Sequence, residues 1–264
     1  MQIAGTSLKP LELWRRDVTL DEARNFASAL AAAAVRAGSG ARVTFAGPRP
    51  TDVLVLFERE SCPYSRLVRE VLSELDLDAL IKPCPAGEGA NNRELLDASG
   101  KSEVPFLVDR SKRVSLGGSE NVVRYLTANY GSHAAPARLQ VSPMTLLSSR
   151  LASSLRGVDL HYGRPKRQPD EPLELWNYEA SPYCRMVRER LGELGMSYHS
   201  HNMARHSPKR SAFKQRFGRE QFPYLFDPNT GVGMFESRAI LRYLQDTYAT
   251  CFDAVSAEIG AHPA

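Results

Sequence analysis

The feature that most constrains this chain is a long internal repeat. The segment SCPYSR at residues 61–66 returns as ASPYCR at 180–185, and LVLF at 54–57 returns as LELW at 173–176. With one residue deleted, VPFL at 104–107 meets FPYL at 222–225, and RYL at 124–126 meets RYL at 242–244. A period this long indicates duplication of a whole domain, not a solenoid of short repeats.

Both copies predict the same order of elements. A helix is expected over 19–38, from the capping pattern TLDE to a glycine stop, and another over 142–157, from Ser142 and Pro143 to Gly157. Each is followed by an apolar strand (53–57 or 173–176), a loop and helix, a strand and helix, a hairpin, and a final helix from Ser119 or Ser237. The order βαβ then ββα predicts an α/β fold with a small mixed sheet and helices on both faces.

This order, with Cys-Pro-Tyr before a helix and Val-Pro before the hairpin, resembles the thioredoxin fold. More narrowly, it is similar to glutaredoxins and to the amino-terminal domain of glutathione S-transferases, and FPYLFDPNTG at 222–231 with FES at 235–237 is similar to tandem proteins of this kind. The resemblance implies two tandem thioredoxin-like domains, each preceded by an extra helix. We expect a glutaredoxin-like repeat over 1–135 and a transferase-like repeat over 136–264.

The composition of the chain indicates its cellular compartment and the kinds of partner it is expected to bind. The four cysteines lack the spacing of a secreted disulfide framework, and the amino-terminus lacks a basic region followed by an apolar one. These features predict the cytoplasm, or a plastid if the source is a photosynthetic eukaryote. A net charge of +4 over 264 residues does not indicate nucleic acid, and the longest apolar stretch, 29–35, is too short for a bilayer.

Cys62 is the candidate nucleophile. A thiol at a helix amino-terminus meets unpaired N–H groups and the positive end of the helix dipole, which favour the thiolate. Arg66 and Arg69 lie near enough in sequence to add positive potential. Because Ser65 cannot close an internal disulfide, exchange would run through a mixed disulfide, most simply with glutathione. The alternative is a structural or relic cysteine.

In the second copy, Ser181 takes the place of the cysteine and cannot attack a disulfide. The resemblance implies that such a serine can activate the thiol of glutathione, as in several transferase classes. Cys184 lies one turn into the helix, where a resolving cysteine would stand, although a non-redox role is favoured. A disulfide between Cys62 and Cys184 would require an interface that brings both loops together.

The resemblance also implies glutathione-binding residues. The residue before a cis proline would present its backbone to the cysteinyl group, and the last helix would offer N–H groups to the γ-glutamyl carboxylate. A serine N-cap without a ligand is the alternative. The implied residues are Tyr64, Val104, Pro105, Gly118, Ser119, Glu120, Tyr183, Phe222, Pro223, Glu236 and Ser237.

Two other patterns are candidates for a metal site and for an anion site. His199, His201 and His206 lack a matching cysteine or acidic cluster, so no metal is expected. The segment from His199 to Arg219 contains six Lys and Arg residues and no acidic one, which favours a solvated helix face over an anion site.

Three functions follow. The first is a glutathione-dependent thiol-disulfide oxidoreductase acting through Cys62, with glutathione as co-substrate and disulfides or glutathionylated proteins as further partners. The second is a non-catalytic glutathione- or protein-binding scaffold of two degenerate thioredoxin folds. The third is a transferase-like enzyme using Ser181, which is weakened because no long all-helical domain follows either copy.

The two extra helices carry apolar residues near helical spacing. They predict a compact pseudo-two-fold pair in which these residues form part of the interface between the copies. The residues are Leu20, Ala23, Ala27, Leu30 and Ala31 in the first helix, and Leu147, Leu151 and Leu155 in the second.

Overall fold

The computed structural model describes residues 20–155, 165 and 167–249. The amino-terminal half contains α1 (Leu20–Val35), β1 (Leu54–Glu58), α2 (Pro63–Glu74), β2 (Ala79–Pro83), α3 (Ala90–Ser99), β3 (Phe106–Asp109), β4 (Val114–Gly117) and α4 (Ser119–Tyr130). A short 3₁₀ helix at Ala137–Leu139 leads to the second half. That half contains α5 (Pro143–Ser154), β5 (Leu173–Asn177), α6 (Pro182–Glu193), β6 (Tyr198–Asn202), α7 (Lys209–Phe217), β7 (Tyr224–Asp227), β8 (Val232–Phe235) and α8 (Ser237–Tyr248).

Each half has the predicted topology. In the first repeat β1 is parallel to β2 and antiparallel to β3, which pairs with β4. In the second repeat β5 is parallel to β6 and antiparallel to β7, which pairs with β8. The βαβ-ββα order and the extra helix before each copy, α1 and α5, are confirmed.

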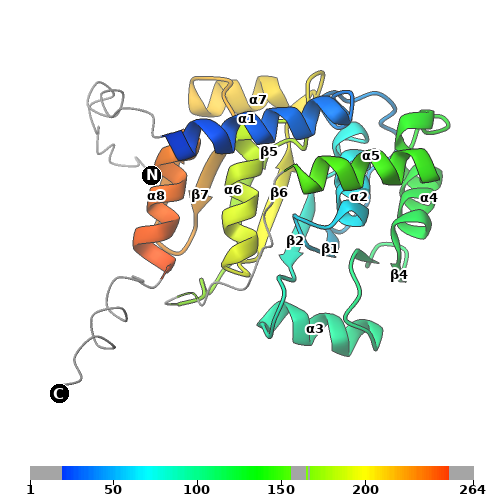
Figure 1. Ribbon diagram of the computed structural model, residues 1–264, viewed down its shortest axis with the longest axis horizontal. Helices are drawn as coiled ribbons and strands as arrows, with labels where there is room; N and C mark the ends of the chain where they lie inside the picture. Colours follow the sequence, from blue (N-terminus) through cyan, green and yellow to red (C-terminus); the bar gives the residue numbers. More distant parts are fainter. Residues whose placement is uncertain (1–19, 156–164, 166, 250–264) are drawn as a thin grey trace, which may run out of the picture.

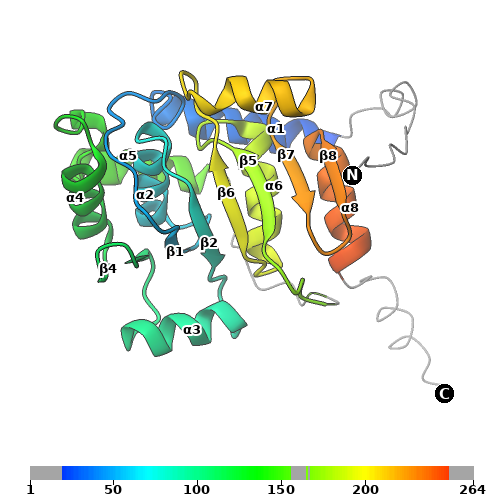
Figure 2. The same cartoon turned by 180° about the vertical axis from the view of Figure 1, so that it is seen from behind.

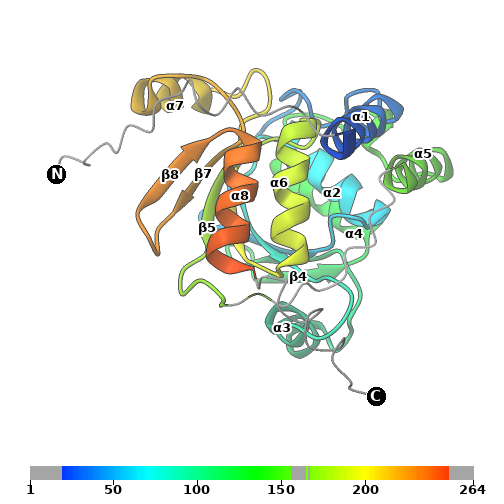
Figure 3. The ribbon, with the colours of Figure 1, turned by 60° about the vertical axis from the view of Figure 1, so that its left-hand side comes forward.

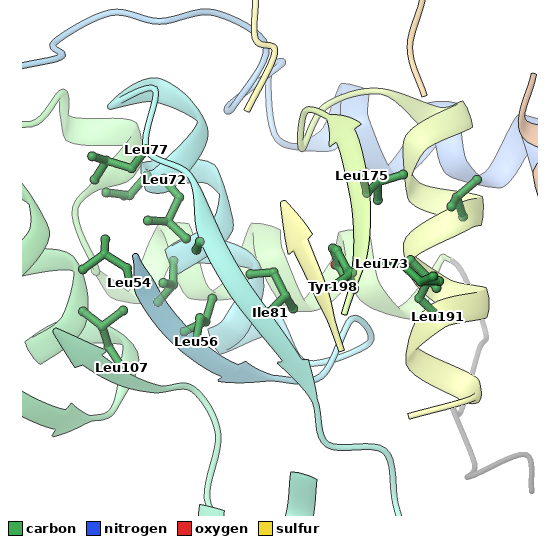
Figure 4. Close-up of a cluster of buried hydrophobic side chains, with 14 of the residues drawn as sticks. Leu54, Leu56, Leu72, Leu77, Ile81, Leu107, Leu173, Leu175, Leu191 and Tyr198 are labelled. Atoms are coloured by element: carbon green, nitrogen blue, oxygen red, sulfur yellow. The ribbon is translucent and has the colours of Figure 1, made fainter. Parts of the chain in front are cut away.

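The two sheets join into one, which the sequence did not reveal. Strand order is β4-β3-β1-β2-β6-β5-β7-β8 (Figure 1, Figure 2). The junction is an antiparallel pairing of β2 with β6, in which Ile81 lies opposite Tyr198 (Figure 4). Two equivalent edge strands therefore satisfy each other's backbone groups about a pseudo-two-fold axis.

Alternating side chains divide the core between the two faces of the sheet. Leu54 and Leu56 of β1 join the main cluster with residues of α2 and α4, whereas Val55 and Phe57 pack with Leu95 of α3 on the other face. In the second repeat the main cluster includes α6 and α8, and α7 covers the opposite face with Phe213 (Figure 3). This is the layering expected of a thioredoxin-like domain.

The extra helices cross between repeats. α1 packs against α5 and α6, and α5 packs against α1 and α2, so each helix contacts the opposite copy. The prediction of a compact pair in which these helices take part is confirmed.

The predicted contact faces of these helices are wrong. α1 buries Ala29 and Ala32, and α5 buries Thr145, Ser149 and Ala152. Arg36, which directly follows α1, is buried as well. The expected residues Ala23, Ala27, Leu30 and Ala31 are exposed, as are Leu147, Leu151 and Leu155. Small and polar residues on the buried faces let the helices approach α2 and α6 closely, and leucines would not fit there. The side chain of Leu20 lies outside the described residues.

The helix ends follow the sequence where they can be seen. Ser142 is the N-cap of α5, its hydroxyl accepts from the Thr145 N–H, and Pro143 takes the first helical position. Gly38, at φ 69°, follows the end of α1 and donates to the Ala33 carbonyl. Thr19, Gly157 and Cys251 lie outside the described residues.

Candidate functional site

Cys62 occupies the predicted position at the start of α2. It is the N-cap residue, with φ −74° and ψ 120°, and Pro63 follows in the first turn. Its side chain accepts no capping hydrogen bond and is half-buried. The first-turn N–H groups are therefore not engaged by the thiol and remain able to stabilise a thiolate.

The neighbours of Cys62 in the helix point inward. The Ser65 side chain is buried and its hydroxyl accepts a long 3.4 Å hydrogen bond from the Arg59 N–H. Arg66 and Arg69, which the sequence suggested as sources of positive potential for the thiol, are also buried. Their charges act in the interface between the repeats.

The other predicted elements of the first site are linked to one another. The Val104–Pro105 peptide bond is cis, as predicted, and the Pro105 carbonyl accepts from the Gly118 N–H at 3.0 Å. Gly118, at φ 84°, is the N-cap of α4, and Ser119 at the first helical position is buried. The exposed Glu120 pairs with Arg124 at 3.2 Å.

The second copy has the same backbone conformation at the equivalent N-cap position, but the N-cap side chain makes a different contact. Ser181 is the N-cap of α6, with φ −74° and ψ 120°, and its hydroxyl accepts from the Cys184 N–H at 3.2 Å. Ser181 is buried, and Cys184 has no solvent exposure. Burial raises the pKa of the Cys184 thiol.

The remaining predicted residues of the second copy are also in place. Phe222–Pro223 is cis, as predicted, and Glu236 is the N-cap of α8 at φ 73°, equivalent to Gly118. The Glu236 carboxylate accepts from the Gln221 side-chain amide at 2.6 Å, and Ser237 is buried. Tyr183 is exposed and its ring lies 4.9 Å from that of Phe26 in α1.

Comparison with known families decides the relationship. A sequence model described as glutathione S-transferase, N-terminal domain, matches residues 56–134 and again 175–251. The chain belongs to this family. The two matches begin at equivalent positions of the repeat and together cover more than half of the chain, so the tandem thioredoxin-like architecture is confirmed.

Comparison with individual proteins adds little. The solved structure titled "Leishmania TDR1 - a unique trimeric glutathione transferase" is 13% identical, with a TM-score of 0.28 over 76% of this chain and 68% of that chain. At that score the likeness carries no weight. A search of curated protein sequences found no match.

The two glutathione S-transferase N-terminal domains share a buried ring of charges that sequence analysis missed. Arg69 Nε lies 3.0 Å from Glu179 Oε2, and Arg188 Nη2 lies 3.0 Å from Glu60 Oε1, which links the repeats. Within each repeat, Arg69 pairs with Glu60 at 3.3 Å and Arg188 with Glu179 at 2.8 Å. Glu60 and Arg69 are the repeat equivalents of Glu179 and Arg188, so the ring is centred on the pseudo-two-fold axis. The available signal was the duplication of these charges, with Arg69 and Arg188 in α2 and α6 and the two glutamates just before these helices.

The charged groups around this ring differ between the two repeats. Burial raises the pKa of Glu58, which also pairs with Arg69, to about 7, whereas the second repeat has the neutral Asn177 at this position. Although burial alone would raise it, the Arg188 and Arg69 guanidiniums hold the pKa of Glu179 well below its usual range. Burial, helped by the charge of Arg185, lowers the pKa of Arg66 to about 10.

Other candidate chemistry is limited. Cys62, Cys84 and Cys184 are free, so no disulfide joins the repeats within the described residues. Those residues also contain no group of His, Cys, Asp or Glu side chains placed to hold a metal ion. None of the helices that the structure describes is long and apolar enough to cross a bilayer.

The basic segment of the second repeat divides into two parts. Lys209 pairs with Asp76 at 3.2 Å, and Arg210 pairs with Glu220 at 2.6 Å. Lys214, Arg216 and Arg219 are exposed. Although burial alone would lower it, hydrogen bonds to Asp78 and Glu174 raise the pKa of His201 to about 9.

Proposed function

We propose that the protein is a glutathione-dependent thiol-disulfide oxidoreductase that acts through Cys62 as a single-thiol site. The observation that carries this proposal is the contrast among the described thiols. Cys62 is a half-buried helix N-cap, whereas Cys84 and Cys184 are buried. Burial raises the pKa of Cys84 to about 12, which keeps that thiol protonated at neutral pH.

The proposed reaction has two exchange steps. The Cys62 thiolate attacks the glutathione sulfur of a glutathionylated substrate, forms a Cys62–glutathione disulfide and releases the substrate thiolate. A second glutathione thiolate then attacks the glutathione sulfur of that disulfide, releases oxidised glutathione and restores the Cys62 thiolate. No second protein cysteine is needed, which agrees with Ser65 in place of a partner thiol.

Glutathione would lie between three elements of the first repeat. We assign its cysteinyl backbone to Val104 before the cis proline, and its γ-glutamyl carboxylate to the start of α4 at Gly118, Ser119 and Glu120. The hydrogen bond from Gly118 to Pro105 supports this assignment because it fixes the two elements relative to each other. The equivalent residues of the second repeat, Phe222, Glu236 and Ser237, would bind glutathione without catalysis.

Two observations speak against catalysis at the second repeat. The Ser181 hydroxyl is buried and already accepts from a backbone N–H, so it is poorly placed to activate an external thiol. Cys184 is buried and protonated at neutral pH. These observations favour a binding or structural role for the second repeat. The non-catalytic scaffold function would then apply to this repeat alone.

The test is reduction of a glutathionylated peptide by glutathione, followed as formation of oxidised glutathione. Cys62→Ser should abolish the reaction, and Cys184→Ser should leave most of it. Equal losses in the two variants would show that the sites cooperate. A wild-type protein that binds glutathione in calorimetry but gives no turnover would favour the scaffold over the oxidoreductase.

A further inference from the structure

Helix α5 of the second repeat lies directly against the Cys62 loop of the first. The Ser149 hydroxyl donates to the Pro63 carbonyl at 2.7 Å, and Arg150 Nη2 donates to the Tyr64 hydroxyl at 2.7 Å. Both acceptors belong to the two residues that follow Cys62. Figure 1 shows α5 crossing α2, so the second repeat contributes neighbouring residues to the wall of the proposed site.

Arg150 brings to this wall a positive charge that no described carboxylate pairs with. Its guanidinium carbon lies 5.7 Å from the centre of the Tyr64 ring, and its hydrogen-bond partner is a neutral phenol. No Asp or Glu pairs with Arg150 in the described part of the chain, and its side chain is exposed. A guanidinium has five N–H donors. Tyr64 therefore orients the group while leaving donors and positive charge available to a ligand.

The other arginines near the start of α2 are not placed as Arg150 is. Arg59, in the loop before Cys62, is half-buried and donates through Nε to the Cys84 carbonyl at 2.9 Å. Arg69 is buried among carboxylates, and Arg36 is buried and bound to Glu70 at 2.6 Å. Arg66 is buried as well. Among the described residues, Arg150 is thus the exposed cation that is hydrogen-bonded to this turn.

The second copy provides a natural contrast. Tyr183, the equivalent of Tyr64, meets the ring of Phe26 from α1 in place of a guanidinium. The copy with a cysteine therefore has a cation beside its tyrosine, and the copy with a serine has an apolar ring. Of the two copies, the one with the N-cap thiol is the one with a positive charge beside its tyrosine.

We propose that Arg150 is a specificity-determining residue of the Cys62 site, where it attracts and orients a carboxylate of the incoming thiol or disulfide. The proposal rests on the proposed function, in which that substrate is glutathione, a peptide with two carboxylates. An exposed guanidinium suits this role because it is always charged and has several N–H donors to offer a carboxylate. The site would then be complete only when both repeats are present.

The experiment compares alkylation of Cys62 by iodoacetate and by iodoacetamide, read by mass spectrometry of the Cys62 peptide. The two reagents react at the same kind of carbon with the same leaving group and differ in charge. Arg150→Gln should lower the iodoacetate rate about three-fold relative to the iodoacetamide rate, as expected for unit charges several ångströms apart in water. Arg150→Lys should keep the ratio, and added salt should reduce it in the wild type.

Arg242→Gln is the matched control, because it removes the same charge from an exposed position on α8 and should leave the ratio unchanged. An unchanged ratio in Arg150→Gln would overturn the proposal. An equal fall in the Gln and Lys variants would also overturn it, because the effect would then be one of shape and not of charge.

Turnover supplies a second measurement. Arg150→Gln should raise KM for glutathione several-fold with kcat largely kept, and an unchanged KM would contradict the proposal. Absence of turnover in the wild type would end the oxidoreductase function, whereas the alkylation ratio would still decide the role of Arg150.

Discussion

At single positions, the two repeats keep one backbone and differ in chemistry. Cys62 and Ser181 have the same φ and ψ, but the serine hydroxyl accepts from the third residue of its helix and the thiol accepts no such bond. Sulfur is a weak acceptor, so it leaves the first turn open. The replacement therefore changes which group the helix amino-terminus can stabilise.

We expect Cys62 to react fastest among the described thiols. Burial raises the pKa of Cys84 to about 12 and also raises that of Cys184, so both stay protonated and shielded at neutral pH. The measurement is the rate of iodoacetamide alkylation against pH, followed for each cysteine by mass spectrometry. If Cys62 reacts no faster than the buried pair at pH 7, the oxidoreductase proposal fails.

The N-cap of the last helix is a second position at which the two repeats differ, with Glu236 in one and Gly118 in the other. Glu236 has φ 73°, whereas the equivalent Gly118 has φ 84°. Glu236→Gly should be more stable than Glu236→Ala by about 1 kcal/mol, because both lack the carboxylate and only glycine adopts this conformation freely. Urea denaturation gives the difference in the free energy of unfolding.

Gly118→Ala is the matched control for that comparison. An added Cβ would meet no atom closer than 3.8 Å, so its cost is confined to the backbone. It should lose a similar amount of stability, and equal stability of the two Glu236 variants would show that the backbone conformation is not the cause.

Among the elements, α5 shows what the sequence predicted and what it did not. The start of α5 followed from Ser142 and Pro143, and the strand and helix order followed from the repeat. The buried face of α5 did not, because leucine spacing defines an apolar face without saying which face the neighbouring helix covers. The sequence of β6, YHSHN, is polar, so its pairing with β2 was not predicted either. Arg66 and Arg69 were expected to act on the Cys62 thiol, because the sequence does not show that their helix packs against the other repeat.

The reversed face of α5 gives opposite expectations for adjacent residues. Ala152 is fully buried, and Ala152→Leu should cost about 1–3 kcal/mol through overpacking against neighbouring helices. Leu151 is 53% exposed, and Leu151→Gln should change the free energy of unfolding by less than about 0.5 kcal/mol. Chemical denaturation of both variants checks this, and a larger loss at Leu151 would restore the original assignment of the face.

For the whole molecule, the charged interface couples stability to pH. Glu58 has its pKa raised from 4.5 to about 7, so between these values the folded protein keeps a proton that the unfolded chain has lost. Its contribution to stability therefore decreases as pH rises through that window. Glu58→Gln, which resembles Asn177 of the other repeat, should flatten this decrease between pH 5 and pH 8. Parallel pH profiles for wild type and variant would show that Glu58 does not titrate there.

The shared sheet and charge ring also predict that the repeats unfold together. Arg188→Met leaves the buried Glu60 with one arginine in place of two and the buried Glu179 with two in place of three, and should cost about 3–5 kcal/mol. Arg124→Ala, which removes the exposed pair with Glu120, should cost less than about 1 kcal/mol. In a Trp14→Phe background, Trp176 fluorescence reports the second repeat and protection of Cys84 from alkylation reports the first. In Arg188→Met, the midpoints of the urea transitions reported by the two probes should fall by the same amount, because both copies contribute residues to the ring. Separate transitions, with only the Trp176 signal displaced, would mean that the pair is two domains in contact and not one cooperative unit.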